Sequence, residues 1–108
     1  MDLAIALLDD RAMRALHRSS LGRDTTTDVL AFPTESGPRP QADIAICYDE
    51  ARRQAAKRGH RILDELALYV VHGILHLAGH DDHSPRLRKR MWSEQARILA
   101  RLGIRLRS

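Results

Sequence analysis

A chain of 108 residues is long enough for one hydrophobic core and too short for two, so we expect a single domain over residues 1–108. Hydrophobic residues make up 44% of the chain and charged residues 30%, which excludes the composition of a disordered protein. The net charge of +4 favours a polyanionic partner, and the longest apolar run is too short and too interrupted by histidines to span a membrane.

The first half of the chain predicts short strands that alternate with helices. The expected elements are a strand over residues 3–8, a helix from residue 9 or 10, a loop over 19–27, a strand over 28–32 ended by Pro33, a loop at 37–40, a strand over 43–47 and a helix over 49–58. Asp9 or Asp10 can cap the first helix, and Gly59 is placed to end the second.

The second half predicts two longer helices. From Ile62 onward the apolar positions go nearly all round a helix that ends at Gly79, which indicates a buried central helix. Ser84 and Pro85 provide an N-cap and a first helical residue, and the last helix ends at Gly103 with its apolar residues in one stripe. We therefore expect an α+β fold, with a small mixed sheet of about three to four strands packed against helices.

A cluster of metal-binding residue types lies on and after the predicted central helix. His72 and His76 are four residues apart, so both side chains lie on one face of the helix. A third ligand must come from beyond Gly79, where the sequence continues His80, Asp81, Asp82 and His83. Catalytic zinc usually takes three protein ligands and leaves one position open. We expect one metal ion, zinc first, with nickel, manganese or iron as alternatives.

Three other features of the sequence limit the activity, the covalent links and the location that we expect. Metalloproteases of the His-Glu-x-x-His type place a general base beside the first histidine, and here Gly73 stands there, which argues against peptide hydrolysis. Cys47 is the single cysteine, so an intramolecular disulfide is excluded. The N-terminal segment has neither a basic region nor a cleavage-site pattern, and we expect a cytoplasmic protein.

The last helix and the residues after it carry charge of almost one sign. Glu94 is the single acid there, and the cations are Arg86, Arg88, Lys89, Arg90, Arg97, Arg101, Arg105 and Arg107. Such a segment would attract the phosphate backbone of a nucleic acid. On charge pattern alone, a solvated helix face is an equally good interpretation.

Two motifs resemble the YbeY family of bacterial endoribonucleases. The family hallmark His-Gly-x-Leu-His-Leu-x-Gly-Tyr-Asp-His corresponds to residues 72–82, with His83 directly after them, and Thr-Asp-Val-Leu-Ser-Phe-Pro corresponds to residues 27–33. The resemblance implies a mixed α and β fold with a central metal-binding helix and a zinc-like metal. It also implies single-strand-specific cleavage of RNA in the 3′-end processing of 16S rRNA and in quality control of the small ribosomal subunit.

The chain departs from the family pattern at three places. The third family histidine aligns with Asp82, while His83 stands one position later, so either could be the third ligand. A family arginine connected with catalysis corresponds to Leu21, although Arg18 and Arg23 flank that position and could stabilise a phosphate. Family members also usually carry an earlier strand and helix. Either the core is reduced here, or a neighbouring subunit in a homo-oligomer covers the surface.

The resemblance leads to a working hypothesis of zinc-dependent hydrolysis of RNA phosphodiester bonds. Asp81 or His80 could move protons; alternatively Asp81 orients a ligand histidine and His80 fills the aromatic position of the family motif. Two other functions are open. The chain could be a non-catalytic RNA-binding or ribosome-assembly factor with a structural metal, or a metallohydrolase with a substrate other than RNA.

Overall fold

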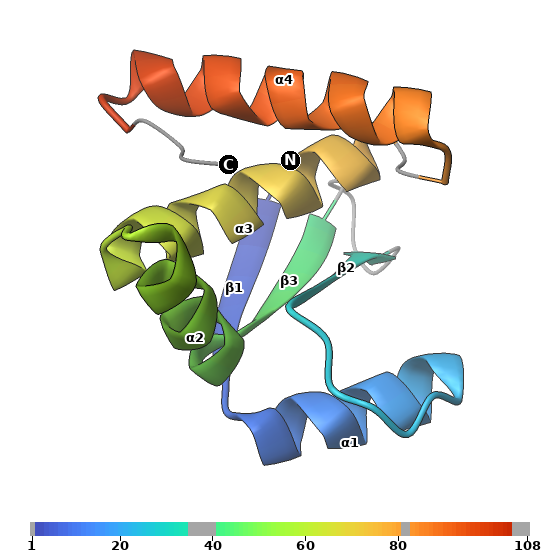
Figure 1. Cartoon of the computed structure of the whole chain (residues 1–108). Helices are drawn as coiled ribbons and strands as arrows, with labels where there is room; N and C mark the ends of the chain where they lie inside the picture. Colours follow the sequence, from blue (N-terminus) through green and yellow to red (C-terminus); the bar gives the residue numbers. More distant parts are fainter. Residues whose placement is uncertain (1, 35–40, 81–82, 105–108) are drawn as a thin grey trace.

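The computed structural model describes residues 2–34, 41–80 and 83–104. They form three strands and four helices in the order β1 (Asp2–Leu8), α1 (Asp10–Leu21), β2 (Val29–Thr34), β3 (Gln41–Cys47), α2 (Tyr48–Arg58), α3 (Ile62–Leu77) and α4 (Pro85–Arg101). The expected α+β class is confirmed, with a mixed sheet of three strands (Figure 1).

The sheet has the strand order β1-β3-β2. Strand β1 runs parallel to β3, and β2 runs antiparallel to it. The prediction that Pro33 ends its strand is wrong, because Pro33 lies within β2 and pairs with Ala42. A proline has no N–H to donate, and it is tolerated here because β2 is an edge strand.

Helix α1 is longer than the sequence pattern suggested. Its N-cap is Asp9, whose carboxylate accepts from Ala12 N at 2.8 Å. The expected loop begins at residue 19, yet the helix continues to Leu21. The hydroxyls of Ser19 and Ser20 donate to the Leu16 carbonyl at 3.1 and 2.6 Å, so both serines satisfy their polar groups inside the helix. This extension carries Leu21 to the end of α1.

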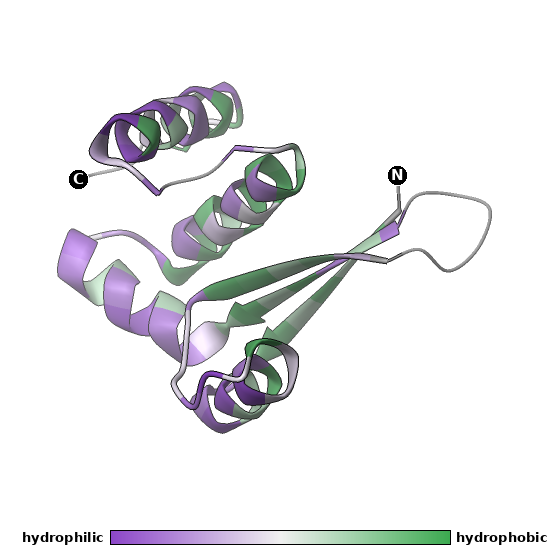
Figure 2. Cartoon of the chain, turned by 90° about the vertical axis from the view of Figure 1, so that its right-hand side faces the viewer, coloured by the Kyte–Doolittle hydropathy of each residue, from purple (hydrophilic) through white to green (hydrophobic). Residues whose placement is uncertain are grey.

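Side chains of β3 point alternately to the two faces of the sheet. Ile44 and Ile46 belong to the larger core, which α3 and α4 complete with residues such as Leu68 and Leu99. Ala45 and Cys47 face the other way and form a smaller cluster with Met13 of α1. The hydropathy colouring shows apolar residues along the strands and polar residues on the outer sides of the helices (Figure 2).

Helix α3 is the central helix, as predicted. It packs against β2 and β3 on one side and against α2 and α4 on the others (Figure 1). Burial does not extend all round it, however, because Leu63 is 68% exposed and Ile74 is 40% exposed. No helix within the described ranges is long and apolar enough to cross a membrane.

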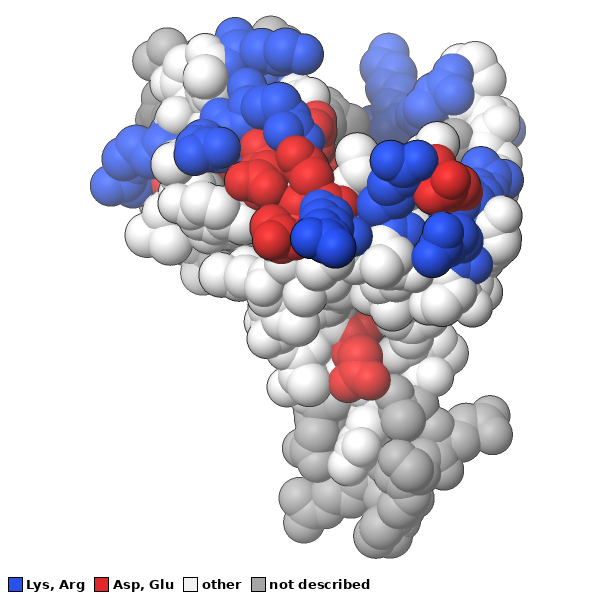
Figure 3. Space-filling view, turned by 90° about the horizontal axis from the view of Figure 1, so that it is seen from below, with Lys and Arg blue, Asp and Glu red and all other residues white. Residues whose placement is uncertain are grey.

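The surface of α1 and α2 carries charges of both signs (Figure 3). Arg53 of α2 makes a bidentate pair with Asp10 of α1, with nitrogen to oxygen distances of 2.8 and 2.7 Å. Arg14 pairs with Asp24 at 2.9 Å. These exposed pairs tie α1 to its neighbours but are individually weak.

Candidate metal centre and nucleic-acid interface

His72 and His76 lie one turn apart on α3 and line the same cavity. This cavity, which we call the histidine cleft, has a volume of about 250 Å³. Its other walls are Gly73 of α3, residues 29–32 of β2 and Leu21 at the end of α1. His76 is exposed and His72 is half-buried, so the cleft is open to solvent. Both imidazoles are thus accessible to a ligand from outside.

A buried glutamine fixes the orientation of His72. The Gln95 side-chain oxygen lies 2.6 Å from His72 Nδ1, and Gln95 itself is buried. An amide oxygen only accepts, so Nδ1 carries the hydrogen and donates it, and in the neutral imidazole Nε2 keeps its lone pair. Ligand histidines in metal sites commonly have such an oxygen partner on the second ring nitrogen. The arrangement fits a metal ligand at His72 Nε2.

Sequence reasoning missed Gln95, although the sequence holds a signal for it. Met91, Gln95 and Leu99 follow one another at steps of four and are all buried in α4. A polar residue within an apolar stripe must find a partner in the core. The pattern identifies Gln95 as a buried hydrogen-bonding group, but it does not identify His72 as the partner.

Gly73, between the two histidines, allows α3 to approach the sheet closely. A Cβ atom at this position would lie 3.2 Å from two side-chain carbons of Ile44 on β3. A side chain at this position would therefore require Ile44 or α3 to shift by a few tenths of an ångström.

The arginine positions expected from the sequence are not in the histidine cleft. Leu21, which stands at the family arginine position, lines the cleft and is 56% exposed. Arg18 and Arg23 are both exposed, and neither lines this cavity. The described part of the cleft therefore has no guanidinium on its walls.

The candidates for a third ligand lie beyond the end of α3. His80 lines a separate hollow with Gly79 and Arg90, and His83 is exposed directly before α4. Asp81 and Asp82 lie outside the described residues. Within the described ranges no three His, Cys, Asp or Glu side chains come together in a way that could hold a metal ion. The structure brings together the pair His72 and His76, and the third ligand stays a prediction.

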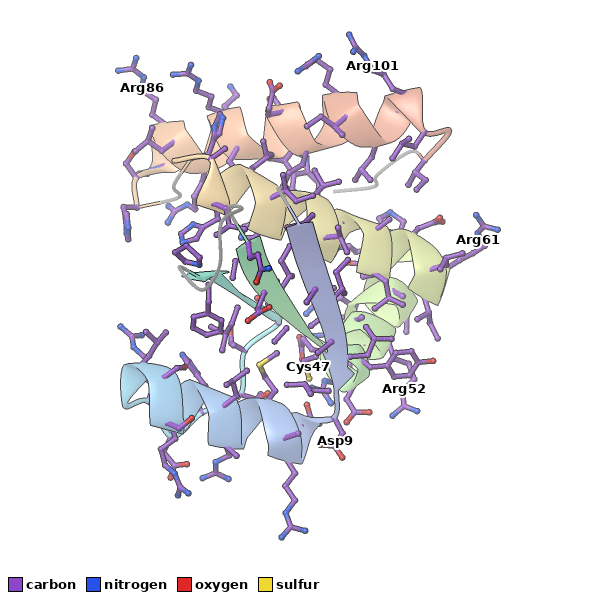
Figure 4. All side chains as sticks on the ribbon, turned by 180° about the vertical axis from the view of Figure 1, so that it is seen from behind. Asp9, Cys47, Arg52, Arg61, Arg86 and Arg101 are labelled. Carbon is purple, nitrogen blue, oxygen red and sulfur yellow. The ribbon has the colours of Figure 1, made fainter. Side chains whose placement is uncertain are left out.

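Helix α4 carries exposed cations along its length. The exposed members in this helix are Arg86, Arg88, Lys89, Arg90, Arg97 and Arg101. Arg97 pairs with Glu94, and no other ion pair joins these cations to the residues that the structure describes. Arg86 and Arg101, at the two ends of α4, point away from the rest of the molecule (Figure 4). The surface can therefore meet an extended polyanion.

Several relatives that share one name match most of the chain. A protein of Myxococcus xanthus named endoribonuclease YbeY is 42% identical over 96% of this chain, which spans 37% of that protein. The equally named protein of Halorhodospira halophila is 39% identical over 95% of this chain and 71% of its own length. The relative from Mycolicibacterium smegmatis is 41% identical, and the chain spans 62% of its length.

A solved structure and a family model agree with these matches. The solution structure of TM1509 from Thermotoga maritima superposes with a TM-score of 0.59 and 30% identity, covering 86% of this chain and 62% of that one. The model of the family described as endoribonuclease YbeY matches residues 1–103. This chain therefore belongs to the endoribonuclease YbeY family.

Proposed function

We propose that this chain is a metal-dependent endoribonuclease that cleaves single-stranded RNA during maturation of the small-subunit rRNA. Family membership supports the reaction class, because relatives that match nearly the whole chain are named endoribonucleases. The observation that carries the proposal is the His72 and His76 pair, which lies in an open cleft with His72 Nε2 left as a lone-pair donor by Gln95. We further propose that this reaction takes place in the cytoplasm, where RNA of this kind is available.

The proposed metal is zinc, held by His72, His76 and one residue from the connection to α4. Asp82 and His83 are the two candidates for that third ligand, and nickel, manganese or iron are the alternative metals. When bound, such an ion supplies Lewis-acid polarisation of a phosphoryl oxygen and activation of water. The open His76 side of the cleft is where a phosphodiester would approach.

The residues of this chain would bind the RNA backbone through α4. Its exposed cations are free of ion pairs with the described residues, apart from Arg97, and can contact phosphates directly. Affinity should therefore fall steeply with salt, since each phosphate contact releases counterions. Arg18 and Arg23 do not line the cleft, and stabilisation of negative charge by either residue stays a proposal. Proton transfer by His80, which lines a separate hollow, also stays a proposal.

Cleavage of single-stranded RNA by the purified, zinc-loaded chain tests this function. His76→Ala should abolish cleavage, and equal cleavage by both proteins would indicate a contaminating nuclease. An RNA duplex of the same sequence should not be cleaved.

A second candidate function follows from Leu21. A chain without an arginine in the cleft could bind RNA without cleaving it, as an assembly factor does. Leu21→Arg distinguishes the two functions, because a guanidinium there would stabilise developing negative charge and raise cleavage about tenfold or more. Leu63→Arg is the matched control, since Leu63 is exposed and does not line the cleft. Binding of RNA without cleavage, in the unaltered chain and in both variants, would favour the assembly factor.

A further inference from the structure

A second cavity lies next to His72, on the side of α2 and α4. It has a volume of about 300 Å³, and its walls come from α2, α3, α4 and Asp28 directly before β2. We call it the tryptophan cavity, after Trp92 in its wall. His72 lines both this cavity and the histidine cleft, so the two cavities adjoin at this side chain.

Tyr69 lines the tryptophan cavity and has a buried hydroxyl group without a hydrogen-bond partner among the described residues. Tyr69 is 4% exposed, and its hydroxyl makes no hydrogen bond to any residue that the structure describes. Burial and the neighbouring carboxylates of Asp28 and Glu65 raise the pKa of this hydroxyl, so it stays protonated and can donate. A buried hydroxyl without a partner is unfavourable, and a polar ligand would satisfy it.

A guanidinium lies over an aromatic ring at the wall of the same cavity. The Arg58 guanidinium carbon lies 5.5 Å from the centroid of the Trp92 ring. Arg58 is held in place because its Nη1 donates to the buried Glu65 at 2.7 Å, and His60 bonds to the other carboxylate oxygen at 2.8 Å. Flat aromatic and guanidinium surfaces stack on unpaired bases without regard to sequence.

A cation stands at the side of the cavity. Arg88 lies one helical turn before Trp92 on α4, lines the cavity and is exposed. It makes no ion pair with the described residues. Its guanidinium is therefore available to a phosphate that adjoins a group inside the cavity.

We propose that the tryptophan cavity binds one unpaired nucleobase of an RNA strand whose neighbouring phosphate lies at the histidine cleft. The base would stack near Trp92 and Arg58, while the Tyr69 hydroxyl and the Asp28 carboxylate bond to its polar edge. A cavity of this volume is at the small end of ligand sites, which suits one base and excludes a base pair. The proposal rests on the proposed function and gives it a physical reason for single-strand specificity, since a base must leave its helix to enter.

Fluorescence of Trp92 tests this proposal directly, because Trp92 is the single tryptophan of the chain. The metal-free protein would be titrated with each of the four ribonucleoside 5′-monophosphates and with ribose 5-phosphate. Saturable quenching by nucleotides, and none by ribose 5-phosphate at the same concentrations, is expected. Equal responses to ribose 5-phosphate and to the nucleotides would show that the charge alone binds, and would overturn the proposal.

Two matched pairs of variants identify the contacts. Tyr69→Phe removes only the hydroxyl and should weaken nucleotide binding about fivefold, whereas Tyr48→Phe on the surface of α2 should leave it unchanged. Arg88→Ala should weaken binding about threefold or more at low salt, and Lys57→Ala, which removes an exposed cation of α2 that does not line the cavity, should not. Unaltered affinity in both Tyr69→Phe and Arg88→Ala would overturn the proposal.

The outcome is separable from that of the nuclease assay. Nucleotide binding without cleavage of RNA would contradict the proposed nuclease and retain the base site. Cleavage of RNA without nucleotide binding in the tryptophan cavity would contradict the base site and retain the proposed nuclease.

Discussion

The two faces of the sheet differ in what covers them. The face toward α3 is covered by a core that includes Ile44, Ile46 and Met91, and this side also holds the buried polar residues Glu65 and Gln95. The opposite face has a small cluster around Met13 under α1, which is tied to α2 by the exposed pair of Asp10 and Arg53. The supports of the candidate site are thus internal hydrogen bonds, whereas α1 combines surface ion pairs with one buried polar group, His17, whose Nδ1 lies 2.9 Å from the Thr25 carbonyl oxygen. Changes on the α3 side should therefore affect both stability and the site.

The largest expected effect comes from the buried carboxylate of Glu65. Glu65→Ala would remove the buried carboxylate that Arg58 and His60 both contact and should lower the free energy of unfolding by about 3 kcal/mol. Urea denaturation followed by Trp92 fluorescence measures this. Asp64→Ala is the matched control, because Asp64 pairs with the exposed Arg61 and should cost less than about 1 kcal/mol. Equal losses would contradict the contrast between buried and surface pairs.

Gln95 should matter more for metal affinity than for the fold. Gln95→Leu keeps much of the side-chain volume but removes the acceptor for His72 Nδ1, so zinc affinity should fall about 10- to 100-fold. Competition with a chromophoric zinc chelator measures this. Gln54→Leu provides the control, since Gln54 bonds to Glu50 on α2 and should leave zinc affinity unchanged. An unaltered affinity in Gln95→Leu would show that this hydrogen bond does not orient a ligand.

A smaller effect is expected where α3 meets the sheet. In Gly73→Ala the added Cβ would lie 3.2 Å from Ile44 carbons. This tight contact costs about 2 kcal/mol, the higher helix propensity of alanine offsets about 1 kcal/mol, and stability should fall by about 1 kcal/mol. Ile44→Val removes one of these carbons and should recover part of the loss in the double variant. Strictly additive free energies in the double-mutant cycle would rule out this contact as the cause.

The smallest effect is expected on the α1 side and only at low pH. Hydrogen bonding from Arg53, with a contribution from Cys47, lowers the pKa of Asp10 from 3.8 to about 2. Because the folded-state pKa is depressed, the stabilisation is present above pH 3.8 and is lost as the pH falls through about 2. Asp10→Asn and Arg53→Gln should both make the free energy of unfolding less dependent on pH over this range. If the loss of stability at low pH is unchanged in both variants, the pair of Asp10 and Arg53 does not cause it.

Much of the fold was predictable because it depends on local patterns. The Ser84 cap, the apolar stripe of α4 and the central position of α3 all follow from residues close in sequence. The extension of α1 was missed because serine hydroxyls can turn back to a helix carbonyl, which propensity alone does not show. Pro33 can lie within β2 because β2 is an edge strand. The order of strands in the sheet depends on contacts across the whole chain, so a local sequence pattern does not show it.

The candidate site was predictable only in part, for a similar reason. A spacing of four residues brings His72 and His76 to one cavity because helix geometry is local. Gln95 meets His72 across the contact between α3 and α4, a contact between residues 23 positions apart. The position of Leu21 in the cleft likewise depends on how α1 packs. Neither contact leaves a periodic signal in the sequence.

The connection between α3 and α4 is anchored at both of its ends. Ala78 N donates to the Ile74 carbonyl at 3.0 Å at the end of α3, and Ser84 Oγ accepts from Leu87 N at 3.1 Å at the start of α4. Folding of the two helices already incurs the entropy cost of closing this short loop. A ligand drawn from it would act as a chelating arm, present near His76 at high effective concentration. Lengthening the arm with glycines would dilute that ligand while leaving both helix histidines in place.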